Sequence, residues 1–116
     1  MSRAAVNVER KDAIAWVTLS NPGKLNALAL AMWRTLAETF TALDRDESLR
    51  CIIMRGDGGN FAAGADIEEF ESVRATLADG MQYHNDAIAN ALRAIAECRH
   101  PTVAAIEGVC VGGGLE

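Results

Sequence analysis

The sequence has 116 residues, of which 50% are hydrophobic and 23% charged, and its 11 basic and 16 acidic residues give a net charge of −5. This composition is typical of a globular domain, and the acidic balance disfavours nonspecific binding to nucleic acid or anionic membranes. The first dozen residues carry charges and no long apolar run, so they predict neither a signal peptide nor a membrane span. We therefore expect a cytoplasmic protein.

The cysteines indicate a reducing environment and no metal site. Cys51, Cys98 and Cys110 are odd in number and stand among apolar residues, which is typical of reduced, buried thiols. Cys98 and His100 lie close in sequence, but no second pair of cysteines or histidines completes a tetrahedral metal site. We expect no disulfide framework and no metal.

The first half of the chain predicts a hairpin followed by a helix. Apolar residues at 6–8 and 14–19 indicate two strands, separated by a polar turn at 9–12. Pro22-Gly23 ends the second strand, and from Leu28 to Leu43 apolar residues recur every three to four positions, as in an amphipathic helix. The charged residues at 44–47 then predict a solvated turn.

The second half predicts two buried strands, each followed by a glycine-containing loop. The apolar run at 49–54 is typical of a strand covered on both faces, and 102–106 is another buried-strand candidate. Asp66 followed by Glu69 is a capping-box pattern that predicts a helix beginning at Ile67. A longer helical pattern spans 81–98, and His84 and His100 suit surface or capping roles.

The two small-residue loops, 62–65 and 112–114, suggest a site for a developing negative charge. The glycines at 112–114 predict the start of a helix, whose first turn has unpaired N–H groups and a partial positive charge. Two such loops side by side could bind an oxyanion against bare backbone. A phosphate cradle is disfavoured, because no Lys-Ser/Thr follows the glycines and Glu116 would repel phosphate. Glu116 instead suits proton transfer, although it could also be an ordinary solvated acid at a helix start.

Three segments in order resemble the enoyl-CoA hydratase/isomerase (crotonase) superfamily. Residues 21–28 (NPGKLNAL) are similar to its Asn-Ala-Leu segment, 61–67 (FAAGADI) to its FxAGAD(I) segment, and 105–116 to its GxxxGGGxE segment. The resemblance covers the whole chain. It implies an α/β fold, a crotonase-like superhelix of repeated ββα turns, of which residues 1–116 would be the N-terminal portion of a single, truncated domain.

The resemblance also implies a site. The carbonyl oxygen of an acyl-CoA thioester would be bound by the N–H groups of Ala65 and Gly113, and Glu116 would take the place of the first catalytic glutamate. No cofactor is implied beyond coenzyme A as part of the substrate. The residues implied to contact substrate or CoA are Lys24, Leu25, Ala27, Ala63, Gly64, Ala65, Asp66, Ile67 and Gly113. We favour a capping role for Asp66, and Glu68 stands where many hydratases have a CoA-binding lysine.

The resemblance predicts an enzyme that adds water to 2-enoyl-CoA thioesters, in fatty acid or related acyl-CoA metabolism. An isomerase of the same family, a noncatalytic acyl-CoA-binding protein and an assembly fragment are the alternatives. Hydratases use a second glutamate about one helix beyond the position of Glu116, so we expect these 116 residues to belong to a longer enzyme and to be inactive alone. The resemblance implies a homotrimer or a dimer of trimers at full length.

Overall fold

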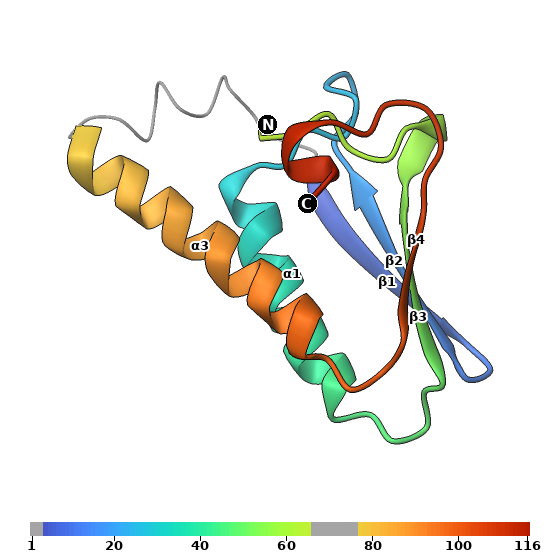
Figure 1. The fold of residues 1–116 in the computed structure, drawn as a ribbon. Coiled ribbons are helices and arrows are strands. Elements are labelled where there is room, and N and C mark those ends of the chain that lie inside the picture. Colours follow the sequence, from blue (N-terminus) through green and yellow to red (C-terminus); the bar gives the residue numbers. More distant parts are fainter. Residues whose placement is uncertain (1–3, 66–76) are drawn as a thin grey trace.

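A computed structural model describes residues 4–65 and 77–116, with the side chains of 77–84 left undescribed (Figure 1). The described residues form a four-stranded sheet in the order β1-β2-β3-β4, and helices α1 and α3 lie on one face of it. The elements are β1 (Ala5–Lys11), β2 (Ile14–Ser20), α1 (Leu30–Asp44), β3 (Cys51–Gly56), α3 (Leu77–Glu97), β4 (Thr102–Ala105), and the 3₁₀ turns η1 (Asp57–Gly59) and η2 (Gly112–Gly114). The helix predicted to begin at Ile67 lies outside the described residues.

Strands β1 and β2 form the predicted antiparallel hairpin, but its turn is shorter than expected. Lys11 pairs with Ile14, so the connection is only Asp12-Ala13, with Asp12 at φ 56°. The prediction of a polar turn at 9–12 is therefore wrong, because three of those residues belong to β1. Strand β1 is at the edge of the described sheet, where exposed charged side chains are compatible with strand pairing.

Strands β2, β3 and β4 run parallel to one another. Ile14 pairs with Cys51, and Ile52 in turn pairs with Thr102. Parallel strands place their carboxyl ends at the same edge of the sheet. The loops that follow the three strands therefore emerge together, next to the start of α1 (Figure 1).

The core lies between helix α1 and one face of the sheet. The amphipathic helix predicted from Leu28 is confirmed, and its buried face packs on alternate residues of β2 and β3. The buried residues of α1 are Met32, Trp33, Leu36, Phe40 and Leu43. The buried hydrophobic residues of the two strands are Ala15, Val17, Leu19, Ile52 and Met54.

Burial of the parallel strands is less complete than the sequence predicts. In β3, Ile52 and Met54 are buried but Ile53 is only half-buried, because the described helices cover a single face. Strand β4 is mostly exposed, with Val103 at 51%, since it forms the other edge of the described sheet. Both strands were expected to be buried, and the expectation is wrong for the described part of the chain. The cysteines are also half-buried rather than buried, and all are free thiols.

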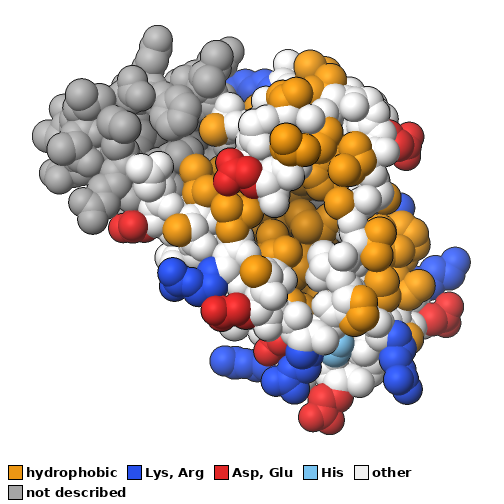
Figure 2. Space-filling model, viewed as in Figure 1, with side chains coloured by type: hydrophobic (Ala, Val, Ile, Leu, Met, Phe, Trp, Pro, Cys, Tyr) orange, Lys and Arg blue, Asp and Glu red, His pale blue; other side chains and the backbone are white. Residues whose placement is uncertain are grey.

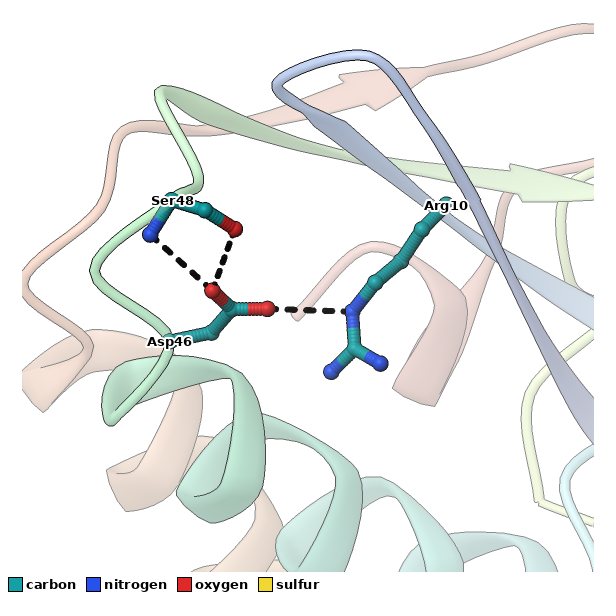
Figure 3. Close-up of polar contacts among 3 residues, drawn as sticks. All are labelled: Arg10, Asp46 and Ser48. Atoms are coloured by element: carbon teal, nitrogen blue, oxygen red, sulfur yellow. Dashed lines mark hydrogen bonds and ion pairs between the residues drawn. The ribbon is translucent and has the colours of Figure 1, made fainter.

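The charged turn after α1 forms specific contacts and is not merely solvated. The Asp46 carboxylate accepts hydrogen bonds from the Ser48 N–H and hydroxyl and pairs with Arg10 Nε at 3.2 Å (Figure 3). Asp44 accepts a hydrogen bond from the Arg99 N–H at 2.8 Å. These contacts tie the turn to β1 and to the segment between α3 and β4.

The same contacts predict an acid-sensitive component of stability. Hydrogen bonds from Ser48 lower the pKa of Asp46, and the Arg99 N–H lowers the pKa of Asp44, each from an ordinary value of 3.8. A carboxylate whose pKa is lower in the folded state stabilises the fold above its unfolded pKa, and this contribution is lost as the pH falls through the folded value. We expect Asp46→Asn to flatten the decline of the unfolding free energy below pH 3.8, measured by urea titration at a series of pH values.

Ser48→Ala should reproduce part of this effect, because it removes the hydroxyl that donates to Asp46. Thr35→Ala is the matched control, since the Thr35 hydroxyl donates only to a backbone carbonyl within α1. An Asp46→Asn protein with the wild-type acid dependence would contradict the assignment.

Candidate active site

The candidate site lies where the loops after β2, β3 and β4 meet. The Leu28 N–H donates to the Gly64 carbonyl at 2.6 Å, which joins the first of these loops to the second. The Val111 N–H donates to the Ala62 carbonyl at 3.1 Å, which joins the second loop to the third. Isolated parallel bridges at Leu28–Ala65 and Ala62–Cys110 extend the pattern of the sheet into the loops.

The two small-residue loops approach each other at backbone distance, as the sequence predicts. A Cβ atom on Gly64 would lie 3.5 Å from the Val111 carbonyl oxygen and 3.7 Å from the Gly113 nitrogen. Gly64 has a φ of 97° and Gly112 a φ of 51°, conformations that glycine adopts without steric cost. A Cβ on Gly114 would come within 2.3 Å of the Ala62 carbonyl oxygen, so this glycine is needed for the close approach.

The glycine run forms the first turn of a helix-like structure. Residues Gly112–Gly114 adopt a 3₁₀ turn, and the N–H groups of Leu115 and Glu116 both donate to the Gly112 carbonyl. Within the described residues, neither the Gly113 N–H nor the Ala65 N–H has a hydrogen-bond acceptor. Unpaired N–H groups at the start of a helical turn favour a negatively charged partner.

A largely apolar pocket of about 220 Å³ lies on the helix side of the glycine turn. Hydrophobic side chains gather in and around this hollow, between α3 and β4 (Figure 2). Gly113 and Glu116 belong to its wall, together with Leu28, Trp33 and Ile95. Glu116 is exposed, and Ala65 pairs with Leu28, which also belongs to the pocket wall, while the neighbouring Gly64 lies against Gly112 and Gly113.

The first loop, which holds three of the predicted CoA-contacting residues, is joined to the second loop through Asn26 and Leu28. Ala27 is buried, Lys24 is half-buried, and Leu25 is 53% exposed although its side chain is apolar. Leu25 has a φ of 51°, a left-handed conformation that costs a branched residue roughly 1–2 kcal/mol. Strain of this kind gathers at functional sites, which supports a ligand-contacting role for this loop. Ala63 and Gly64 lie in the neighbouring segment, whereas Asp66, Ile67 and Glu68 are outside the described residues.

Sequence reasoning missed a group of asparagines that supports these loops. Asn21 and Asn26 are both 4% exposed, and their side-chain amides hydrogen-bond to backbone groups of the first two loops. The Asn60 side-chain oxygen accepts a hydrogen bond from the Val109 N–H at 3.0 Å, which connects the second loop to the third. The sequence signal was available for Asn21, next to Pro22, and for Asn60, next to Gly59, because such combinations are typical of turns whose side chains bond to the backbone.

The described residues contain neither a membrane-spanning helix nor a metal-binding cluster. None of the helices seen there is both long enough and apolar enough to cross a membrane. Across residues 4–65 and 77–116, no group of three or more histidine, cysteine or acidic side chains is placed to hold a metal ion.

Comparison with known proteins identifies the family. The sequence profile described as enoyl-CoA hydratase/isomerase matches residues 9–116. The chain belongs to the enoyl-CoA hydratase/isomerase family. A crystal structure of an enoyl-CoA hydratase/carnithine racemase from Magnetospirillum magneticum is 45% identical and superposes with a TM-score of 0.88 over 95% of this chain and 41% of that one. The crotonase-like α/β fold predicted from the sequence is thereby confirmed.

The curated relatives are named for more than one activity. The enoyl-CoA hydratase ACTT3 of Alternaria alternata is 37% identical over 90% of this chain and 34% of its own length. A (7aS)-7a-methyl-1,5-dioxo-2,3,5,6,7,7a-hexahydro-1H-indene-carboxyl-CoA hydrolase of Mycobacterium tuberculosis is 36% identical over 90% of this chain and 41% of its own length. The chain therefore spans less than half the length of these family members, and both relatives are named for CoA esters.

The close approach of the two loops predicts that Gly114 cannot be enlarged. Gly114→Ala places a methyl group against the Ala62 carbonyl and should destabilise the protein by about 1–3 kcal/mol, since overpacked sites force the backbone to shift. We expect faster hydrogen exchange of the Val111 N–H, which donates to Ala62, measured by NMR. Gly58→Ala is the control, because Gly58 has open space around it and only its φ of 70° opposes the change. Unchanged exchange at Val111 in the Gly114 variant would contradict the tight packing.

Proposed function

We propose that the protein carrying this chain is an enoyl-CoA hydratase that adds water across the double bond of 2-enoyl-CoA thioesters. The observation that carries the proposal is the backbone approach of Gly64 to Gly113, with Glu116 on the same turn as Gly113. Membership of the enoyl-CoA hydratase/isomerase family and the acyl-CoA ligands named for its relatives support the same substrate class. Coenzyme A is part of the substrate, and the proposed reaction needs no further cofactor.

In the proposed reaction the N–H groups of Gly113 and Ala65 bind the thioester carbonyl oxygen. Attack of water at C3 moves the electrons of the double bond toward the carbonyl, so that negative charge builds on this oxygen. Two N–H donors preorganised around it stabilise the enolate-like transition state more than the substrate. Both groups lack an acceptor among the described residues, as this role requires.

Glu116 is proposed to accept a proton from the attacking water. It lies three residues after Gly113 and lines the apolar pocket with it, which places a carboxylate beside the proposed carbonyl-binding group. Protonation at C2 then completes the hydration, and the second acid required for it is not assigned within this chain. The apolar wall around Leu28, Trp33 and Ile95 is a suitable environment for an acyl group.

Enoyl-CoA isomerisation is the alternative, because removal of a proton next to the thioester builds charge on the same oxygen. The family description covers both activities. Mass spectrometry of the product separates the two reactions, since hydration adds one water and isomerisation leaves the mass unchanged. The expectation of a homotrimer or a dimer of trimers rests on the family resemblance alone.

Replacement of Glu116 tests the proposal directly. In the full-length polypeptide, Glu116→Gln should lower kcat for a short 2-enoyl-CoA by roughly 10²–10⁴-fold, the usual contribution of a general base. Affinity for a saturated acyl-CoA, measured by calorimetry, should stay near the wild-type value because the amide has the same shape. Glu107→Gln is the matched control, an exposed glutamate on the segment after β4. Undiminished turnover in the Glu116 variant would remove the assignment.

A further inference from the structure

We propose that Asn26 is a positioning residue that holds the two candidate oxyanion donors, Ala65 and Gly113, at their working separation. The inference rests on the proposed function and concerns a residue that does not itself touch the substrate. Asn26 stands between Leu25 and Ala27, two of the predicted CoA-contacting residues, yet it is 4% exposed. Its side chain points into the protein and bonds to backbone groups of two loops.

The Asn26 side chain is almost fully used in hydrogen bonds. Its Oδ1 accepts from the Asn21 N–H at 2.9 Å, which closes the loop after β2 on itself. Its Nδ2 donates to the carbonyl oxygens of Asp57 at 2.7 Å and Asn60 at 2.8 Å, both in the loop after β3. One planar amide therefore joins the two loops, because it accepts from one and donates to two backbone carbonyls of the other.

From Asn26 the connection to Ala65 is short. Two residues further along, the Leu28 N–H donates to the Gly64 carbonyl, and Leu28 forms a bridge with Ala65. Asn26 and Leu28, the residue that pairs with Ala65, thus lie two positions apart in the same loop. This turn is braced further by the Asn21 Nδ2, which donates to the Ala27 carbonyl at 2.7 Å.

The connection to Gly113 runs through Asn60. Asn26 holds the Asn60 carbonyl, and the Asn60 side chain accepts a hydrogen bond from the Val109 N–H. The Val109 carbonyl in turn accepts from the N–H groups of Phe61 and Ala62, and the Ala62 carbonyl accepts from Val111. The backbone that leads into Gly113 is therefore fixed against the same segment that leads into Ala65.

The backbone conformation at this position also suits asparagine. Asn26 has a φ of 58°, and asparagine is one of the few residues with a side chain that adopts this region readily. The preceding Leu25 is held in the same region without such an advantage. We infer that the hydrogen bonds of Asn26 hold this strained pair of residues in place.

Two substitutions distinguish the contribution of the Asn26 side-chain amide from that of its left-handed backbone conformation. Asn26→Gly keeps the left-handed conformation without strain but removes every side-chain hydrogen bond. Asn26→Asp keeps the size and the acceptor oxygen but turns the two donated bonds into contacts between oxygens. In the full-length polypeptide we expect both variants to lower kcat about 100-fold with KM changed by less than about threefold, because misplaced donors weaken transition-state binding alone.

A readout that needs no activity keeps this inference separate from the proposed function. Hydrogen exchange measured by NMR should accelerate at the N–H groups of Leu28, Val109 and Val111 in both variants, even if the wild-type protein turned over no enoyl-CoA. Leu43→Ala is the matched control, a buried core residue near the far end of α1 that lowers stability without touching the loops. It should leave kcat unchanged under conditions where the protein stays folded, and any faster exchange should extend to the amides of the core instead of being confined to these three.

Either of two results would overturn the inference. If the Asn26→Gly variant kept the kcat and the hydrogen-exchange rates of the wild-type protein, the amide would not be needed to hold the loops. A raised KM with unchanged kcat would assign Asn26 to CoA binding instead of to the position of the oxyanion donors. If the wild-type protein has no hydratase activity but the exchange rates respond as predicted, the proposed function fails while the structural coupling through Asn26 stands.

Discussion

Strands β2, β3 and β4 are hydrogen-bonded in parallel, and this common direction forces the loops after them to leave the sheet at one edge. Parallel strands must be joined by a crossover connection, and α1 and α3 lie in the two crossovers. Both helices lie on the same face of the described sheet. Residues from positions 21–28, 57–65 and 108–116 become neighbours only through this arrangement. The core of α1, β2 and β3 is thus the support on which the candidate site is built.

At that edge the loops are joined mainly through backbone groups. Bridges at Leu28–Ala65 and Ala62–Cys110 continue the pairing of the strands, and glycines permit an approach that a Cβ at Gly114 would prevent. Such a site presents N–H groups in place of charged side chains, which suits a reaction whose negative charge appears only in the transition state. Buried asparagine amides then supply the hydrogen bonds that a loop without regular structure lacks.

The family, the order of the elements and several candidate site residues follow from local patterns in the sequence. The helix period after Leu28, the hairpin and the glycine segments each depend on neighbours within a few positions, which is why they are predictable. The predictions that were wrong concern residues whose conformation or contacts depend on parts of the chain that are distant in sequence. Glu9, Arg10 and Lys11 look like a turn because they are charged, yet an edge strand accepts them. Asp44 and Asp46 look solvated, but their partners Arg99 and Arg10 are distant in sequence.

The sequence by itself determined the crotonase-like family and the segments that carry Gly113, Ala65 and Glu116, because the motifs and their spacing are properties of the sequence alone. Only the tertiary structure brought these segments together: Gly113 and Glu116 line one pocket with Leu28, Ala65 pairs with Leu28, and Gly64 lies against Gly113. It also decided the role of Asn26, whose partners Asp57 and Asn60 are more than thirty positions away along the chain. Hydrogen bonds across such separations depend on strand pairing and loop direction, and neither can be read from a short stretch of sequence.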